Sequence, residues 1–167
     1  MAMTPRQCEI AAEAYTTSLL AQCGFDVLVQ YGANQPQYDL VADRNDHLMR
    51  ISVKGSQDGG WMLSVRYKDA SISYHEAIDL WHKAHRAETV FLFVQFLDVV
   101  TGAPPRVYVA RPAEIAGQLK AQCGGKGYGA LIENRRRWSP KSKYDERIPQ
   151  EWVFSETRIE AVAASLR

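Results

Sequence analysis

Hydrophobic positions along the chain recur with two spacings, which together predict an alternation of helices and strands. An amphipathic helix is predicted from Thr4, a helix-capping residue, to Gly24, which stands just past its end. Runs rich in β-branched and aromatic residues predict strands at 25–30, 38–41 and 50–54. The amino-terminal third therefore reads as a helix followed by three strands.

The rest of the chain continues this alternation. Its expected elements are a strand at 61–65, a helix at 73–86, strands at 89–96 and 106–109, and helices at 111–122 and 155–166. Residues 89–96 are almost all apolar, which is typical of a central strand buried on both faces. This order predicts an α/β fold with one mixed sheet flanked by helices, early strands antiparallel and later strands joined by helical crossovers.

Composition indicates a single domain. The chain has 167 residues, of which 46% are hydrophobic, enough for one sizeable core. We expect one domain over 1–167, with its core at about 5–110 and a basic extension at about 124–167. A net charge of +1 argues against indiscriminate coating of nucleic acid but allows a local basic groove.

The sequence carries no pattern for membrane insertion or for a disulfide framework. No apolar run approaches twenty residues and the start has no apolar signal region, so we expect neither a membrane span nor a signal peptide. The three cysteines, Cys8, Cys23 and Cys123, are an odd number without CxxC spacing. Reduced thiols in a cytoplasmic protein are the expectation.

Asp39 and Lys54 on neighbouring strands are the first candidates for chemistry. If Asn45 and Asp46 form a two-residue turn, antiparallel register places Asp39 opposite Ser52, with Lys54 diagonal to it on the same face. A carboxylate, a hydroxyl and an ammonium would then converge within roughly 5–8 Å. Such a group suits a divalent cation and a water directed at a phosphodiester.

A second register stays open at this point. A three-residue turn would shift the pairing by one and send Ser52 and Lys54 to the face opposite Asp39. Asp39 and Lys54 are equally compatible with a cross-strand ion pair on a solvated face, worth only ~0–1 kcal/mol.

These residues resemble, in order and spacing, the PD-(D/E)XK nuclease superfamily, which includes restriction-type endonucleases, Holliday junction resolvases and homing endonucleases. The resemblance covers roughly residues 7–96 and implies the restriction endonuclease-like αβββαβ core. It implies that Asp39 is the main ligand of magnesium, with manganese as a substitute, and that Lys54 is the catalytic lysine. Glu13 is implied as the helix acid, with Glu9 on the same face as a reserve.

Ser52 departs from the family pattern, which usually has an acidic residue there. A neutral hydroxyl is a poorer ligand for a hard cation than a carboxylate. Either Glu13 supplies the second carboxylate, with the backbone carbonyl of Val53 completing the site, or the site has lost catalysis. In the second case the protein would bind nucleic acid or a protein partner without cleavage.

A basic segment follows the predicted core. Its candidate nucleic-acid-binding residues are Arg135, Arg136, Arg137, Trp138, Lys141 and Lys143. Clustered cations neutralise phosphates and aromatic rings stack on bases, so we expect this segment to face nucleic acid. The alternative is a solvated loop whose arginines pair with Asp145 and Glu146.

Two other patterns are better explained without a ligand. His82 and His85, three residues apart, could share a metal ion, but the exterior of an amphipathic helix explains them as well. The glycines at 124–129 follow a helix rather than a strand, so a flexible connector is favoured over a phosphate loop.

The sequence therefore leads to a magnesium-dependent nuclease that hydrolyses phosphodiester bonds in nucleic acid, with DNA implied by the resemblance. A homodimer is implied where such domains cut both strands. The alternatives are a catalytically degenerate binding module and an interaction protein whose basic segment docks on an acidic partner.

Overall fold

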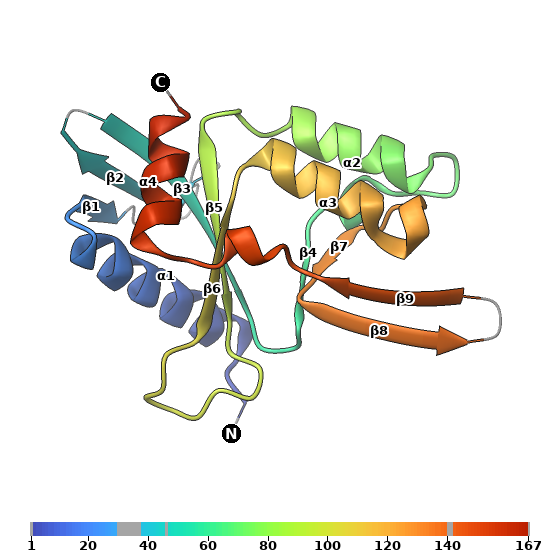
Figure 1. Ribbon diagram of the computed structural model, residues 1–167, viewed down its shortest axis with the longest axis horizontal. Helices are drawn as coiled ribbons and strands as arrows, with labels where there is room; N and C mark the ends of the chain where they lie inside the picture. The colour runs from blue at the N-terminus through green and yellow to red at the C-terminus, as the bar shows by residue number, and fades with distance from the viewer. Residues whose placement is uncertain (1, 30–37, 46, 140–141, 167) are drawn as a thin grey trace.

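The computed structural model describes residues 2–29, 38–45, 47–139 and 142–166, with the backbone alone at 47, 136–139 and 142–144. A five-stranded sheet in the order β1-β2-β3-β5-β6 forms its centre (Figure 1). These strands are β1 (Asp26–Val29), β2 (Leu40–Arg44), β3 (His47–Ser56), β5 (Thr89–Gln95) and β6 (Arg106–Ala110).

The strand directions make the sheet mixed. Strands β1, β2 and β3 are antiparallel, whereas β3 runs parallel to β5 through the crossover helix α2 (Tyr74–Lys83). With α1 (Pro5–Gln22) in front, the order reproduces the expected αβββαβ core. Strand β6 returns antiparallel to β5 through residues 96–105, so the expectation of helical crossovers between the later strands is wrong there.

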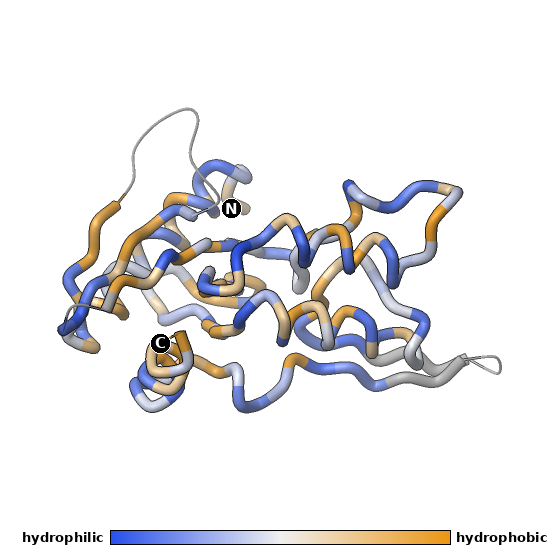
Figure 2. The backbone as a smooth tube through the Cα atoms, turned by 90° about the horizontal axis from the view of Figure 1, so that it is seen from above, coloured by the Kyte–Doolittle hydropathy of each residue, from blue (hydrophilic) through white to orange (hydrophobic). Residues whose placement is uncertain are grey.

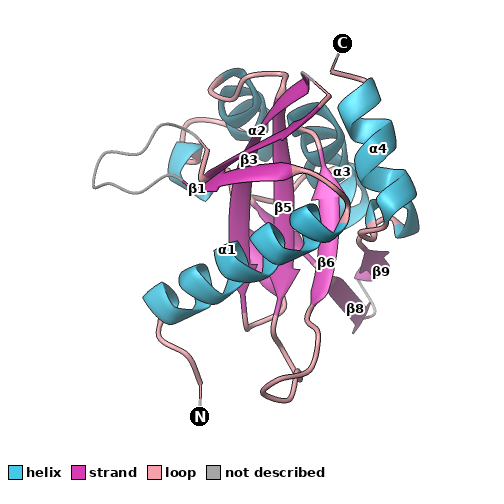
Figure 3. Ribbon diagram, turned by 90° about the vertical axis from the view of Figure 1, so that its left-hand side faces the viewer, coloured by secondary structure: helices cyan, strands magenta, loops and turns pink. Residues whose placement is uncertain are grey.

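Helices cover the two faces of the sheet. Helix α1 and helix α4 (Glu156–Ala164) pack on one face, and α2 and α3 (Pro112–Gly125) pack on the other (Figure 3). The helices alternate between hydrophilic and hydrophobic segments, as expected of elements with one face in the core (Figure 2). Every residue of β5 is buried, which confirms the expected strand buried on both faces.

Local capping explains where the first helix begins and ends. The Thr4 side chain accepts a hydrogen bond from the Gln7 backbone while the Gln7 side chain accepts one from Thr4, a complete capping box. Gly24, with φ of 78°, follows the last turn. The predicted first helix is thus confirmed at both ends.

Two small sheets lie outside the central sheet. Strand β4 (Gly60–Met62) pairs with β7 (Ala130–Ile132), and β8 (Asn134–Ser139) pairs with β9 (Ser142–Arg147) in a separate hairpin. The strand predicted at 61–65 is shorter than expected, because the chain enters the 3₁₀ turn η1 (Val65–Tyr67). A second 3₁₀ turn, η2 (Gln150–Trp152), buries Trp152 in the core.

Trp61, Trp81 and Trp152 are all buried, as expected of core residues. Cys8, Cys23 and Cys123 are free thiols. Among the described residues, no helix combines the length and the apolar composition needed to cross a bilayer.

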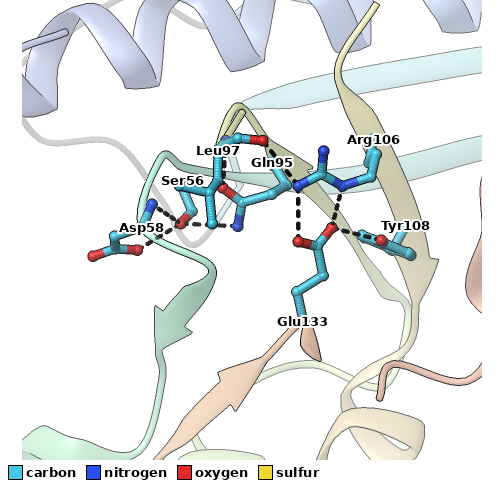
Figure 4. Close-up of polar contacts among 7 residues, drawn as sticks. All are labelled: Ser56, Asp58, Gln95, Leu97, Arg106, Tyr108 and Glu133. Atoms are coloured by element: carbon cyan, nitrogen blue, oxygen red, sulfur yellow. Dashed lines mark hydrogen bonds and ion pairs between the residues drawn. The ribbon is translucent and has the colours of Figure 1, made fainter. Parts of the chain in front are cut away.

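A polar network ties the end of β3 to the base of the hairpin (Figure 4). Its members are Ser56, Asp58, Gln95, Leu97, Arg106, Tyr108 and Glu133. Glu133 accepts hydrogen bonds from Arg106 at 2.7 and 2.9 Å and from the Tyr108 hydroxyl at 2.6 Å. Gln95 donates to the Ser56 hydroxyl at 3.2 Å. The network borders a cavity of about 500 Å³.

Glu133 anchors this network as a carboxylate. Burial raises the pKa of its carboxyl, but the hydrogen bonds from Arg106 and Tyr108 outweigh burial and hold it below the usual glutamate range. Burial and the same carboxylate raise the pKa of Tyr108, which stays a protonated donor. The ionised form of Glu133 is therefore part of the folded structure.

We predict that Glu133→Gln lowers the free energy of unfolding by about 1.5–3 kcal/mol at neutral pH, because hydrogen bonds to a charged group are lost. A depressed pKa stabilises the fold above the unfolded-state pKa, and that contribution is lost as pH falls through the folded-state value. Urea unfolding across a pH series should therefore show the two proteins converging in acid. Glu9→Gln, on the exposed Arg6–Glu9 pair, is the control and should change little. A gap that persists in acid would contradict the prediction.

Gly55 sets how closely α1 approaches β3. A Cβ atom there would lie 2.8 Å from the Cys8 carbonyl oxygen and 3.0 Å from the Ala12 Cβ. We predict that Gly55→Ala destabilises the protein by about 1–3 kcal/mol through overpacking. Gly117→Ala, in open space on α3, should instead stabilise it by roughly 0.5–1 kcal/mol. Thermal melts of both variants test this, and equal effects would refute the close packing of α1.

Candidate functional site

The register of β2 and β3 decides whether the candidate residues meet. The pairing runs from Leu40 opposite Ile51 to Arg44 opposite His47, so the turn holds two residues. The next position before Leu40 is Asp39, which lies beside Ser52. Asn45 has φ of 54°, as a tight hairpin turn requires. The two-residue register is confirmed, and the shifted register is wrong.

Asp39 is held by β3 itself. Its Oδ2 accepts a hydrogen bond of 2.6 Å from the Val53 backbone N–H and one of 3.4 Å from the Ser52 hydroxyl. The Asp39 backbone N–H donates to the Ile51 carbonyl at 2.8 Å. Asp39 thus bonds to β3 through both its backbone N–H and its side chain, one residue before β2 begins.

Ser52 and Lys54 share one face of β3, because side chains alternate along a strand. Ser52 is buried, at 3% exposure, whereas Lys54 is exposed. Within the described ranges, no carboxylate lies within ion-pair distance of the Lys54 ammonium. Lys54 is therefore available to a ligand at this edge.

Glu13 reaches the same region from α1. Its side chain is partly buried, and burial followed by the negative charge of Asp39 raises the pKa of its carboxyl. Lys54 opposes this shift with its positive charge. The structure therefore brings Glu13, Asp39 and Lys54 within electrostatic reach of one another. Glu9, the reserve acid, is exposed and pairs with Arg6 at 2.7 Å.

The oxygen atoms here suit a hard cation. Two carboxylates that repel each other, Asp39 and Glu13, are the kind of pair that a divalent cation neutralises. The Val53 carbonyl lies on the same strand edge as its N–H, which faces Asp39, because both groups of one residue point to one side. Among the described residues, no three histidine, cysteine or acidic side chains gather closely enough to hold a metal by themselves.

An open cleft of about 370 Å³ adjoins Lys54. Glu9 and Cys8 of α1 form one wall, and Trp61 of β4 lies on the other. The Trp61 indole donates to the Lys54 carbonyl at 2.8 Å and so fixes the strand next to the cleft.

The basic segment forms the hairpin β8–β9, which extends away from the central sheet (Figure 1). Arg135 is mostly buried and pairs with Glu146 at 2.6 Å. It also contacts Cys123 at 3.1 Å and lies over the Tyr128 ring. Its charge is thus compensated inside the protein. The backbone of Arg136, Arg137, Trp138 and Lys143 lies in the two strands, and Lys141 lies outside the described residues.

The histidine pair does not form a metal site within the described residues. The His85 Nδ1 bonds the Trp81 carbonyl at 2.7 Å, and its ring packs on Trp81 and Phe91. Phe91 is the neighbour of Ser52 in β5, so His85 lies close to the candidate site.

Two cations on this face were missed by sequence reasoning. Arg50 occupies the same face of β3 as Ser52, and the period of two along the strand was the signal that could have shown it. Arg66, in η1, is brought near His85 only by the tertiary fold, in which η1 packs against α2.

No protein-family model matches this sequence, and no curated protein matches it. Solved structures with a similar fold include the bacterial homing endonuclease I-Ssp6803I, with 16% sequence identity and a TM-score of 0.49 over 98% of this chain and 96% of that one. Another is Hjc, a Holliday junction resolvase from Archaeoglobus fulgidus, with 16% identity and a TM-score of 0.41 over 74% of this chain and 88% of that one. The likeness concerns the arrangement of helices and strands. What this chain does rests on its own residues.

Proposed function

We propose that this protein is a metal-dependent nuclease that hydrolyses phosphodiester bonds in nucleic acid, with DNA as the substrate. The observation that carries the proposal is the Asp39 carboxylate, which the Val53 N–H fixes at the free edge of β3, one residue before Lys54 in that strand. The charges of Asp39 and Lys54 both act on the carboxyl of Glu13. Two carboxylates and an ammonium are the groups that cation-assisted phosphodiester hydrolysis needs.

Asp39 and Glu13 would hold the cation, with the Val53 carbonyl as a third oxygen ligand. A bound magnesium or manganese ion supplies a more acidic water and neutralises phosphate charge. Lys54 contributes separately: its ammonium stabilises negative charge that develops on the phosphoryl oxygens and on the attacking water. Asp39 is held for this task by the Val53 N–H, so its second oxygen stays available.

Ser52 favours the alternative function, a nuclease fold that binds nucleic acid without cutting it. Its hydroxyl already donates to Asp39 and adds no charge to the site. A cation at this site would therefore have two side-chain ligands, Asp39 and Glu13. Catalysis and mere binding differ in one measurable property, metal-dependent cleavage.

We predict that Asp39→Asn abolishes manganese binding in calorimetry and lowers plasmid nicking at least about 100-fold, because the main charged ligand is lost. Lys54→Met should lower nicking to a similar degree while manganese binding persists, since its ammonium is not a ligand. The control is Asp26→Asn, an exposed carboxylate on β1. Wild-type protein that neither binds manganese nor nicks DNA would overturn the nuclease proposal. Binding of DNA in EDTA would then support the alternative.

Ser52→Asp tests whether the neutral hydroxyl at this position limits cation binding. A buried carboxylate next to Asp39 repels it, so we predict a lower melting temperature in EDTA than for the wild type. Manganese should raise the melting temperature of Ser52→Asp more than that of the wild type, because a third carboxylate strengthens binding of a hard cation. Ser52→Asn, which adds bulk without charge, is the matched control. A Ser52→Asp protein that gains nothing from manganese would argue that no cation sits beside this strand.

A further inference from the structure

Four basic residues lie on or near the face of β3 that carries Ser52. They are Arg50 and Lys54 on β3, Arg66 in η1 and His85 just after α2. Arg50 and Lys54 are four residues apart on one face, which places them about 13 Å from each other along the strand. Both are exposed, as is Arg66. We call this set the cationic face.

Helices α2 and α3 cover the β5 side of this face. Phe91 and Phe93 on β5, the neighbours of Ser52 and Lys54, are buried under these helices. Leu48, which precedes Arg50 on the same face, is 67% exposed. On this face of β3, the side chains of Arg50 and Lys54 are therefore exposed to a ligand, whereas Ser52 between them and the neighbouring residues of β5 are buried.

The His85 imidazole is affected by charges from both β3 and η1. Burial lowers the pKa of its imidazole, the hydrogen bond with the Trp81 carbonyl opposes this, and the charges of Arg66, Lys54 and His82 lower it further. The positive charges of Arg66 and Lys54 thus both lower the pKa of the His85 imidazole. A carbonyl only accepts, so Nδ1 carries the hydrogen and Nε2 is left for a ligand.

The cations of this face are held in place without being neutralised. Arg66 lies over the Tyr67 ring, 4.9 Å from its centroid, and donates to the Tyr67 hydroxyl at 2.9 Å. Arg50 lies 5.9 Å from the centroid of the Tyr38 ring. In the described part of the chain, neither arginine forms an ion pair with a carboxylate. Aromatic faces orient a cation but leave its charge in place.

Like charges gathered without counter-ions oppose folding, and an anionic ligand relieves the repulsion. Arg50 and Lys54 are about 13 Å apart along the strand, a spacing at which each cation can contact a different phosphate of one chain. The charge and spacing therefore fit an extended polyanion.

We propose that Arg50, Lys54, Arg66 and His85 form a phosphate-binding surface that holds the sugar–phosphate backbone of a nucleic acid beside Asp39. This inference rests on the proposed function for the identity of the polyanion. It assigns substrate binding to the central sheet rather than to the β8–β9 hairpin, where Arg135 is paired with Glu146.

The test is fluorescence anisotropy with a labelled DNA duplex of about 30 base pairs, in EDTA, over roughly 50–200 mM salt. We expect Arg50→Ala and Arg66→Ala each to weaken binding about 5–20-fold and to reduce the slope of log affinity against log salt by about 1. Lys126→Ala, an exposed cation after the helical part of α3, is the matched control and should leave both values unchanged. Circular dichroism melts verify that each variant is folded.

A pH series examines His85 separately. Because its pKa lies below the ordinary histidine value of about 6.5, we expect binding to strengthen as pH falls below that range. His85→Asn should remove this extra gain, since asparagine keeps a polar group but gains no charge. If His85→Asn shows the same pH dependence of binding as the wild type, His85 is not part of the phosphate-binding surface.

The outcomes separate this inference from the proposed nuclease activity. Unchanged affinity in both arginine variants would overturn the inference, even if Asp39-dependent nicking is observed. Loss of affinity in the arginine variants, with no nicking by any protein, would support the surface and reject the nuclease. A wild-type protein that binds an acidic protein or anionic vesicles but not DNA would overturn the inference too. Lys143→Ala tests the hairpin, and loss of affinity only there would place binding on the hairpin instead.

Discussion

The candidate site depends on a difference in strand length. Strand β3 has ten residues, but β2 pairs only with its first half, from His47 to Ile51. Beyond Ile51 the edge of β3 that faces β2 has backbone groups with no partner in that strand. The Asp39 carboxylate takes the first of these, the Val53 N–H, at 2.6 Å. A buried backbone donor is costly to leave unpaired, so the same hydrogen bond serves the fold and positions the carboxylate.

The opposite edge of β3 is paired with β5 from Arg50 to Ser56. This parallel pairing requires the α2 crossover, which in turn carries His85 to the face of Ser52. On the other face, Gly55 allows α1 to lie close to β3 and to bring Glu13 toward Asp39. Groups from both faces can thus meet only at the edge that β2 leaves free.

Ser52 makes this arrangement stable in the absence of a ligand. A buried hydroxyl beside Asp39 donates a hydrogen bond, whereas a buried carboxylate would repel it. With a neutral residue at Ser52, the Asp39 charge still acts on Glu13, whose carboxyl pKa is raised by burial and by Asp39. A serine at this position thus makes the ligand-free fold more stable than an acidic residue would. The same lack of charge weakens cation binding.

The sequence by itself determined most of the elements and narrowed the register of the β2–β3 hairpin to two choices, one of which the structure shows. Local signals suffice for this: Thr4 and Gly24 bound α1, the apolar run at 89–96 marks a central strand, and the two-residue turn aligns Asp39 with Ser52. Each depends on neighbours in the chain. Only the tertiary structure decided that Arg135 is paired with Glu146 and that Arg66 and His85 lie near Lys54. Those relations join residues on separate elements, and no periodicity in the sequence records the packing between separate elements.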